Sequence, residues 1–225
     1  MKKAIIIAAG MGRRMQVLTD DTPKCMLKFG DKTLLQHQLE AYRACGITEI
    51  NVVRGYKKEK INYEGLKYYE NTNYKNNNIL SSLMYAEEAI SGHVICAYSD
   101  ILFDYQIVEK VIESYHDINV VVDLDWRGYY EERQDHPLEE AENIIFDSED
   151  KVVSAGKIMA KKNVPHGEFI GMMKFSPRGA EIFKRHFKRD KKLYTGKPFC
   201  RARSFENAYL TDIIQDMVDM GVKIH

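Results

Sequence analysis

The chain has few cysteines, and none of them is placed for a metal site. No CxxC or CxxH pair occurs, and each cysteine lies in or beside an apolar stretch. This spacing excludes the common zinc-binding patterns and predicts structural thiols that stay reduced in a reducing compartment. The four residues are Cys25, Cys45, Cys96 and Cys200.

A long apolar run is also missing. The first apolar segment, residues 4–8, is too short for a membrane span, and it leads into a glycine turn that does not match a signal peptide. We therefore expect a cytoplasmic protein with no membrane partner.

The chain carries no net charge, because 33 basic residues balance 33 acidic ones. No overall field attracts nucleic acid or an anionic membrane, so any recognition of phosphate has to be local. This balance excludes a general polyanion-binding protein, and we expect no nucleic-acid partner.

The first half of the chain does contain a regular alternation of short β-branched runs and helical patterns. Such alternation predicts β-α-β units and a mostly parallel sheet. Up to residue 125 the pattern is that of a doubly wound, Rossmann-like α/β fold, which binds ligands at the carboxyl ends of its strands. Strands are expected at residues 3–9, 49–55, 67–71, 93–100 and 118–125, and helices at 33–46, 79–90 and 105–115.

The pattern changes after residue 125. Residues 126–142 have no clear apolar period and combine aromatic with charged side chains, which predicts a lid inserted over the sheet. A hairpin at 143–157, a strand at 168–176 and helices beginning at 177 and 207 predict a small antiparallel part. We expect one domain, with a nucleotide-binding half (residues 1–124) and an acceptor-binding lid and C-terminal half (residues 125–225).

The turn AAGMGRRM, residues 8–15, is not a dinucleotide-binding fingerprint. That fingerprint needs a third glycine and an acidic residue after the second strand, but Met15 takes the glycine position and the strand ends in Arg54 and Gly55. The spacing of a Walker loop does not occur either.

Two interpretations of this turn remain. In one, Gly10 and Gly12 bring backbone N–H groups to a triphosphate, and basic side chains neutralise it. In the other, the segment is a glycine turn with exposed cations. The sequence TPK, which ends at Lys24, favours the triphosphate site.

Residues 8–47 resemble the nucleotidyltransferases that activate sugar phosphates and phosphocholine, whose signature is GxGxR followed by a downstream PK. The resemblance implies that Arg14 is the catalytic arginine and that Lys24 is a catalytic, phosphate-binding lysine. Arg13 stands where many members carry a small residue. The nucleotide-binding residues expected in the loop are Ala8, Ala9, Gly10, Gly12 and Arg13.

Asp100 is the expected metal ligand. The segment CAYSDILF resembles the family's strand that ends in Gly-Asp, with Ser99 in place of the glycine, and in the family this aspartate binds magnesium. Carboxylate oxygens suit Mg²⁺, which is the cofactor that the resemblance implies. The alternative is that Asp100 caps the helix that follows.

The segment NNNILSSL resembles the branch of the family that contains phosphocholine and phosphonate cytidylyltransferases. It implies that Asn78 and Ser82 lie near the nucleotide. Asparagine clusters are otherwise common in turns and caps, and Asn78 is also placed to cap the helix that it precedes.

The lid contains the expected acceptor-binding residues. Aromatic rings can bind an alkylammonium or aminoalkyl group, and basic side chains can hold a phosphate or phosphonate. The alternative is that the aromatic side chains pack on the sheet. The aromatic candidates are Trp126, Tyr129 and Tyr130, and the basic candidates are Arg127, Arg133 and His136.

Three further residues are assigned by the resemblance alone. Lys157 stands where the family places a lysine on the acceptor phosphate, so we expect it to be catalytic. Glu168 and Gly171 fall where family members contact the acceptor and allow its close approach.

The function that the resemblance implies is transfer of CMP from CTP to a small phosphonate or phosphomonoester, with release of pyrophosphate. Aminoethylphosphonate, hydroxyethylphosphonate and phosphocholine-like compounds are the expected acceptors. A sugar-1-phosphate nucleotidyltransferase that uses UTP or dTTP and a non-catalytic nucleotide-sensing domain are the alternatives. No general base is expected, because the attacking oxygen is already ionised.

Members of the family usually continue past the last helix into a strand and an acidic motif that supplies a second metal ligand. This chain ends earlier. We expect that it lacks a tail or is part of a longer polypeptide, and a homodimer is the other assembly considered. We also expect weak or absent magnesium-dependent turnover from residues 1–225 alone.

Overall fold

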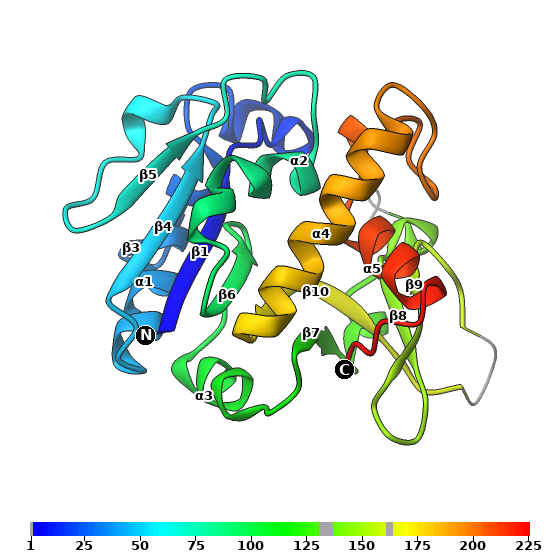
Figure 1. The fold of residues 1–225 in the computed structure, drawn as a ribbon. Coiled ribbons are helices and arrows are strands. Elements are labelled where there is room, and N and C mark those ends of the chain that lie inside the picture. Colours follow the sequence, from blue (N-terminus) through cyan, green and yellow to red (C-terminus); the bar gives the residue numbers. More distant parts are fainter. Residues whose placement is uncertain (1, 131–136, 161–163) are drawn as a thin grey trace.

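The computed structural model describes residues 2–130, 137–160 and 164–225 (Figure 1). Eight strands form the central sheet in the order β5-β4-β1-β6-β10-β8-β9, and β7 also pairs with β10. The strands are β1 (Lys2–Ala8), β4 (Glu49–Arg54), β5 (Lys67–Glu70), β6 (His93–Tyr98), β7 (Ile118–Asp123), β8 (Asn143–Phe146), β9 (Val152–Gly156) and β10 (His166–Phe175). A separate hairpin joins β2 (Lys28–Phe29) to β3 (Lys32–Thr33).

The direction of the strands divides the sheet into two parts. The pairs β5–β4, β4–β1 and β1–β6 are parallel, whereas β10 is antiparallel to β6, β7 and β8. The hairpin β8–β9 is antiparallel as well. The predicted α/β fold, with a mostly parallel sheet and a small antiparallel part, is confirmed.

The side chains of β1 alternate between two hydrophobic cores. Ile5 and Ile7 pack in one core with α2 (Ile79–Leu83), α4 (Pro177–Tyr194) and α5 (Leu210–Asp219). Ala4 and Ile6 pack in the other core with α1 (Leu34–Ala44) and α3 (Tyr105–Glu113). In Figure 1, α2 and α4 lie in front of the sheet and α1 lies behind it. Helices therefore cover both faces of β1, as its continuous apolar sequence requires.

Local sequence signals account for the starts of the helices. The hydroxyl of Thr33 accepts from the N–H of Gln36, whose side chain accepts from the Thr33 N–H, which is a capping box. Asp104 caps α3 through bonds from two backbone N–H groups, and Ser176 caps α4 just before its Pro177.

The helix predicted at 79–90 differs from the expectation, because it is split. α2 ends at Leu83, and a 3₁₀ segment, Met84–Ala89, follows with non-helical dihedrals at Ala86. Four of the buried residues in this stretch lie three apart, which suits a 3₁₀ helix with three residues per turn. They are Leu80, Leu83, Ala86 and Ala89.

The strand β10 joins the two parts of the sheet. Its first residues pair with β8, and its last four pair with β6 on one side and β7 on the other. A bulge between Phe169 and Met172 lies between these regions, and Gly171 within it has a φ of +85°. The bulge lets the strand change partners.

The C-terminal residues continue the sheet along β7 and β9. The N–H of Val152 donates to the carbonyl of Ile224, and the N–H of Val120 donates to the carbonyl of His225. The last residues thus bind the sheet through backbone hydrogen bonds without forming a named strand. Within the described residues, no helix is both long and apolar enough to cross a membrane.

Candidate active site

A cavity of about 340 Å³ lies where β1 and β6 end, and the antiparallel half closes its far side. This volume is within the range of small-molecule sites. Its lining combines the end of β1 and the glycine turn after it, residues 24–25, the start of α2, the end of β6, and two residues from later parts of the chain. The lining residues are Ile7, Ala8, Gly10, Gly12, Met15, Lys24, Cys25, Asn78, Ile79, Tyr98, Ser99, Asp100, Glu142 and Tyr209.

The glycine turn is shaped as a phosphate-binding loop requires. Gly12 has a φ of +62°, and a Cβ there would lie 3.1 Å from Cγ2 of Thr19. The Thr19 hydroxyl donates to the Gly12 carbonyl at 2.9 Å, which fixes the turn. A Cβ on Gly10 would meet nothing within 4 Å, so glycine there leaves open space. Gly12 is therefore needed for the fold, and Gly10 for access.

Two of the loop residues predicted to bind the nucleotide need separate comment. Ala9 is 1% exposed and packs in the core, and its carbonyl accepts from the Tyr56 N–H, so it supports the loop and does not line the cavity. Arg13 lies with its backbone in a 3₁₀ helix, Arg13–Leu18. The side chains of Arg13 and Arg14 lie outside the described part of the structure, and their roles stay predictions.

The far end of the loop is held by residues that sequence reasoning missed. The Tyr56 hydroxyl contacts the carbonyls of Thr19, at 3.0 Å, and of Asp20. Lys57 and Lys60 bind the carboxylate of Asp21 at 2.8 and 2.5 Å, and these hydrogen bonds lower the pKa of Asp21 to about 2. Tyr56 follows directly after β4, so the strand-end rule is the signal that could have found it.

Lys24 and Asp100 meet in the cavity although 76 residues separate them in the sequence. The Lys24 Nζ lies 2.5 Å from Oδ2 of Asp100, and both side chains are about one-third exposed. Asp100 does not cap α3, since Asp104 does that. The two residues predicted to bind phosphate and metal are thus brought together, and the helix-cap alternative for Asp100 is wrong.

Asn78 and Ser82 have different environments. Asn78 lines the cavity, and although it occupies the N-cap position of α2, its side chain makes no cap bond and donates to the carbonyl of Asn207 at 3.1 Å. Ser82 is buried, and its hydroxyl accepts from Asn71 at 2.9 Å. Ser82 thus belongs to a buried polar network and is not part of the cavity wall, contrary to the expectation of a nucleotide contact.

Glu142 is a cavity residue that the sequence did not single out. It lies immediately before β8, and the hydroxyl of Thr211 donates to its carboxyl. Burial raises the pKa of Glu142 to about 7, and the charges of Asp212 and Glu168 add to this effect. An acid at the start of an apolar strand was the available signal, but five other acidic residues in the segment 126–142 obscured it.

Lys157 binds acidic and aromatic groups of the same region. Its ammonium pairs with the Glu140 carboxylate and lies 5.0 Å from the centroid of the Tyr209 ring. Partial burial by itself would lower the pKa of Lys157, but the hydrogen bond to Glu140 and the charge of Glu142 leave it above its ordinary value. The residue stays protonated, as binding a phosphate requires.

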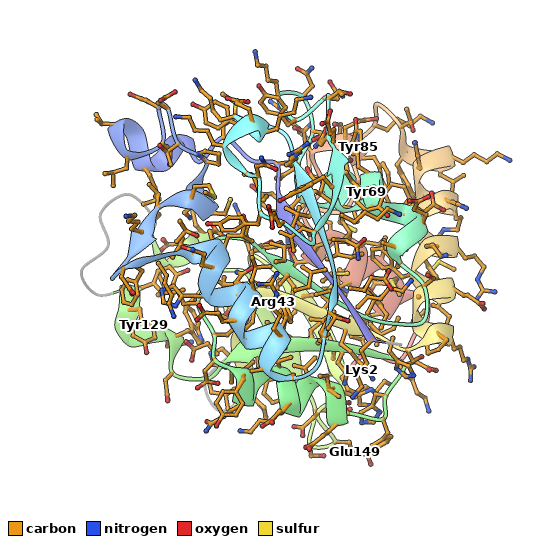
Figure 2. All side chains as sticks on the ribbon, turned by 90° about the vertical axis from the view of Figure 1, so that its left-hand side faces the viewer. Lys2, Arg43, Tyr69, Tyr85, Tyr129 and Glu149 are labelled. Atoms are coloured by element: carbon orange, nitrogen blue, oxygen red, sulfur yellow. The ribbon has the colours of Figure 1, made fainter. Side chains whose placement is uncertain are left out.

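The aromatic side chains of the lid do not form the open surface that we expected. Trp126 and Tyr130 are buried, at 1% and 7% exposure, in a small cluster with Ala141 and Leu138. Tyr129 alone of the three is exposed, at 63%, and Figure 2 shows it at the edge of the molecule. The alternative of internal packing therefore holds for Trp126 and Tyr130.

The other acceptor-binding candidates lie around this cluster. Arg127 is exposed, and its Nη2 lies 3.0 Å from Nε2 of His166. The Tyr130 hydroxyl donates to the carboxylate of Glu168. Arg133 and His136 lie outside the described residues. Contact of any of these residues with an acceptor stays a prediction.

Gly171 does allow a close approach, although to a side chain of the protein. A Cβ at this position would lie 2.3 Å from Cδ2 of Tyr98. The Tyr98 ring also packs edge-to-face on Phe169, with centroids 6.0 Å apart. Because Tyr98 lines the cavity, Gly171 shapes the cavity wall from behind.

The oxygen donors of the cavity suit a hard cation. Asp100 offers a carboxylate that is open to the cavity, and Glu142 offers a second one in the same wall. Cys25 also lines the cavity, but burial raises the pKa of its thiol to about 12, so it is not a thiolate nucleophile. The set of groups fits phosphate and metal binding and does not fit covalent catalysis by cysteine.

Another group of potential metal ligands lies between α4 and α5. The group consists of His186, Asp190 and Asp216. Each residue offers one ligand atom, and these three atoms lie within 4.8 Å of one another. Arg189 binds both carboxylates, at 2.5 and 2.6 Å. The protein supplies the counter-ion here itself, and the group therefore ties α4 to α5 without a metal.

The chain matches one family model and several known proteins. Residues 4–154 match the family model described as MobA-like NTP transferase domain. The chain is 29% identical over 229 residues to the CTP:phosphoglutamine cytidylyltransferase of Campylobacter jejuni, covering 96% of this chain and 88% of the relative.

Two further relatives match over part of their length. The choline-phosphate cytidylyltransferase of Streptococcus pneumoniae is 36% identical over 100 residues, which cover 42% of this chain and 44% of that protein. The 2-aminoethylphosphonate cytidylyltransferase of Lancefieldella rimae is 33% identical over 113 residues, which cover 47% and 46%.

The fold is also found in solved structures. The CTP:phosphocholine cytidylyltransferase of Streptococcus pneumoniae superposes with a TM-score of 0.72 over all of this chain and 88% of its own, at 20% identity. The inositol-1-phosphate CTP transferase of T. maritima also has a TM-score of 0.72 and 20% identity, and the chain covers 84% of it.

Proposed function

The chain belongs to the family of MobA-like NTP transferase domains and is a nucleotidyltransferase, and from this premise we propose that it transfers CMP from CTP to a small phosphonate or phosphomonoester. The cytidylyltransferases among its relatives, which are named for phosphoglutamine, choline phosphate and 2-aminoethylphosphonate, support the choice of CTP.

One observation carries the proposal above the others. The Lys24 ammonium and the Asp100 carboxylate lie 2.5 Å apart in a cavity that the glycine turn also lines. A triphosphate bound there would meet backbone N–H groups and a lysine, and a cation would find a carboxylate at the same point. This combination suits a metal–nucleotide complex.

The transfer joins an acceptor oxygen to the α-phosphorus of CTP and breaks the bond from that phosphorus to the pyrophosphate oxygen. The attacking oxygen is ionised at neutral pH, so no side chain has to remove a proton. Lys24 would neutralise the triphosphate, Arg14 the departing pyrophosphate, and Lys157 would leave Glu140 to align the acceptor phosphate. Positioning and charge neutralisation of this kind carry phosphoryl and nucleotidyl transfer.

Mg²⁺ is the proposed cofactor, and Asp100 is the residue that would hold it. When bound, the ion supplies positive charge beside the phosphates. We also propose a cytoplasmic location, because the four cysteines are free and the substrate is a cellular nucleotide. The relative named for 2-aminoethylphosphonate supports a proposed role in phosphonate biosynthesis.

The test is a matrix of four nucleoside triphosphates against four acceptors, followed by release of pyrophosphate in the presence of Mg²⁺. The acceptors are phosphocholine, aminoethylphosphonate, hydroxyethylphosphonate and glucose 1-phosphate. We expect weak but measurable turnover with CTP and one or more of the three small acceptors. Turnover only with UTP or dTTP and glucose 1-phosphate would refute the proposal, and so would binding of CTP without any turnover.

A further inference from the structure

The ammonium group of Lys157 occupies a site built from acidic and aromatic groups. It pairs with the Glu140 carboxylate and lies over the ring of Tyr209, 5.0 Å from the centroid, which is within the range of a cation–π contact. The charge of Glu142 also acts on it. Side chains from two distant segments, residues 140–142 and Tyr209, thus converge on one cation.

The region around this cation carries an excess of carboxylates. Glu142 is close enough to Asp212 and Glu168 for their charges to disfavour its ionisation, and Glu140 adds a fourth acid. Lys157 is the cation that acts on Glu142 in return. If Lys157 turns toward an acceptor phosphate, Glu140 loses its ion pair with this ammonium, and the positive charge moves away from Glu142.

The charge of the acceptor decides whether this rearrangement is favourable. A purely anionic acceptor, such as a hexose phosphate, would place its negative charge near Glu140 and Glu142 after the Lys157 ammonium has turned away from them, which the Coulomb energy opposes. An acceptor that also carries a positively charged nitrogen would replace the lysine ammonium. Tyr209 would contribute to binding a quaternary ammonium as well, because its ring needs no hydrogen bond from the cation.

We propose that Glu140, Glu142 and Tyr209 form a subsite for a positively charged nitrogen of the acceptor, and that Lys157 fills this subsite until the acceptor binds. The proposal rests on the proposed function and narrows its acceptor to zwitterions that combine an amine or quaternary ammonium with a phosphonate or phosphate. It assigns recognition of the cation to these residues, and not to the buried rings of Trp126 and Tyr130.

The first test compares two acceptors of nearly equal shape. 2-Aminoethylphosphonate carries an ammonium where 2-hydroxyethylphosphonate carries a hydroxyl. We expect kcat/KM with CTP to be at least 10-fold higher for the amine in the wild type, and Glu142→Gln to reduce this ratio at least 10-fold. Gln preserves the size of the side chain, and thermal unfolding verifies the fold.

Glu139→Gln is the matched control, because Glu139 is an exposed acid of the same segment. It should leave the ratio within twofold of the wild type. A ratio near one in the wild type, together with turnover, would overturn the subsite and leave the proposed function standing. No pyrophosphate release from any acceptor would refute the proposed function instead.

The second test does not depend on turnover. Lys157→Gln removes the internal cation, so free choline should bind this variant at least fivefold more tightly than the wild type by calorimetry. The double variant Lys157→Gln with Glu142→Gln should lose that gain. Equal affinity of the wild type and the Lys157→Gln variant for choline would overturn the proposal, whatever the result of the transfer assay.

Discussion

Replacing Glu142 by glutamine should change how the stability of the protein depends on pH. Burial raises the pKa of this carboxyl from 4.5 to about 7 in the folded protein. Between these values the folded state holds a proton that the unfolded state has released, so the stability falls as the pH rises through this window. The loss is absent below pH 4.5 and complete above pH 7.

The size of the effect follows from the shift. A difference of about 2.5 pKa units corresponds to roughly 3 kcal/mol at most. Glu142 lines an open cavity, so solvent reduces its desolvation, and we expect about 1–2 kcal/mol. Glutamine resembles the protonated carboxyl and keeps the bond from Thr211. The variant should equal the wild type near pH 4.5 and exceed its stability by this amount at pH 8.

Urea unfolding at pH 4.5, 6 and 8 measures the difference directly. For a chain of this size, about 1–2 kcal/mol corresponds to a shift of roughly 2–8 °C in Tm. Other carboxyl groups also have a raised pKa, such as Asp190 with a pKa of about 6. They affect the stability of both proteins equally, so their contributions cancel in the comparison. Parallel curves for the two proteins from pH 4.5 to 8 would show that Glu142 ionises normally and would refute the argument from burial.

Four other substitutions and one control test further parts of the site. Lys24→Ala and Asp100→Ala should each lower kcat about 100-fold or more in the pyrophosphate assay. The free energy of unfolding should change by only about 1 kcal/mol, since the pair is partly exposed. Retained turnover would place the site elsewhere. Gly171→Ala should destabilise the protein by about 3 kcal/mol, because the φ of +85° and the contact with Tyr98 both oppose a Cβ. Gly196→Ala, with a φ of +70° and open space, is the control and should lose only about 1 kcal/mol in urea unfolding; equal losses would contradict the role of the contact. Tyr56→Phe should raise the KM for CTP several-fold, because the loop loses its hydrogen bond to the Tyr56 hydroxyl. An unchanged KM for CTP would show that the loop does not need this hydrogen bond.

The parts of the fold that could be predicted are those with a regular local pattern. The apolar run of β1 and the capping residues Thr33, Asp104 and Ser176 are signals within a few residues of each other. The convergence of Lys24 and Asp100 was also accessible, because the rule for strand ends and the family motif place both at one edge of the sheet. The break after Leu83 was hidden, since apolar spacings of three and four residues look alike in a short segment.

The parts that could not be predicted depend on contacts between distant segments. Trp126 is buried because Leu138 and Ala141, which come later in the chain, pack against it. No periodicity in the sequence predicts this contact. The perturbed pKa of Glu142 depends on burial, on Thr211 and Asp212, and on Glu168, and these residues come from two distant points of the chain. The environments of Glu142 and Trp126 therefore could be learned only from the structure. The residues proposed to bind the nucleotide lie mostly in one loop, where the sequence motif predicts them.

The position of β10 in the chain has a consequence for synthesis. β6 ends at Tyr98, and β10, its second neighbour, begins at His166, so 67 residues (166 − 98 − 1) must be made between them. At roughly 5–20 residues per second this takes several seconds. During this time the nascent chain presents the apolar edge of β6 without a partner, which is a favourable edge for pairing with another chain. The parallel part of the sheet thus depends on a strand made late in synthesis to cover the edge of β6.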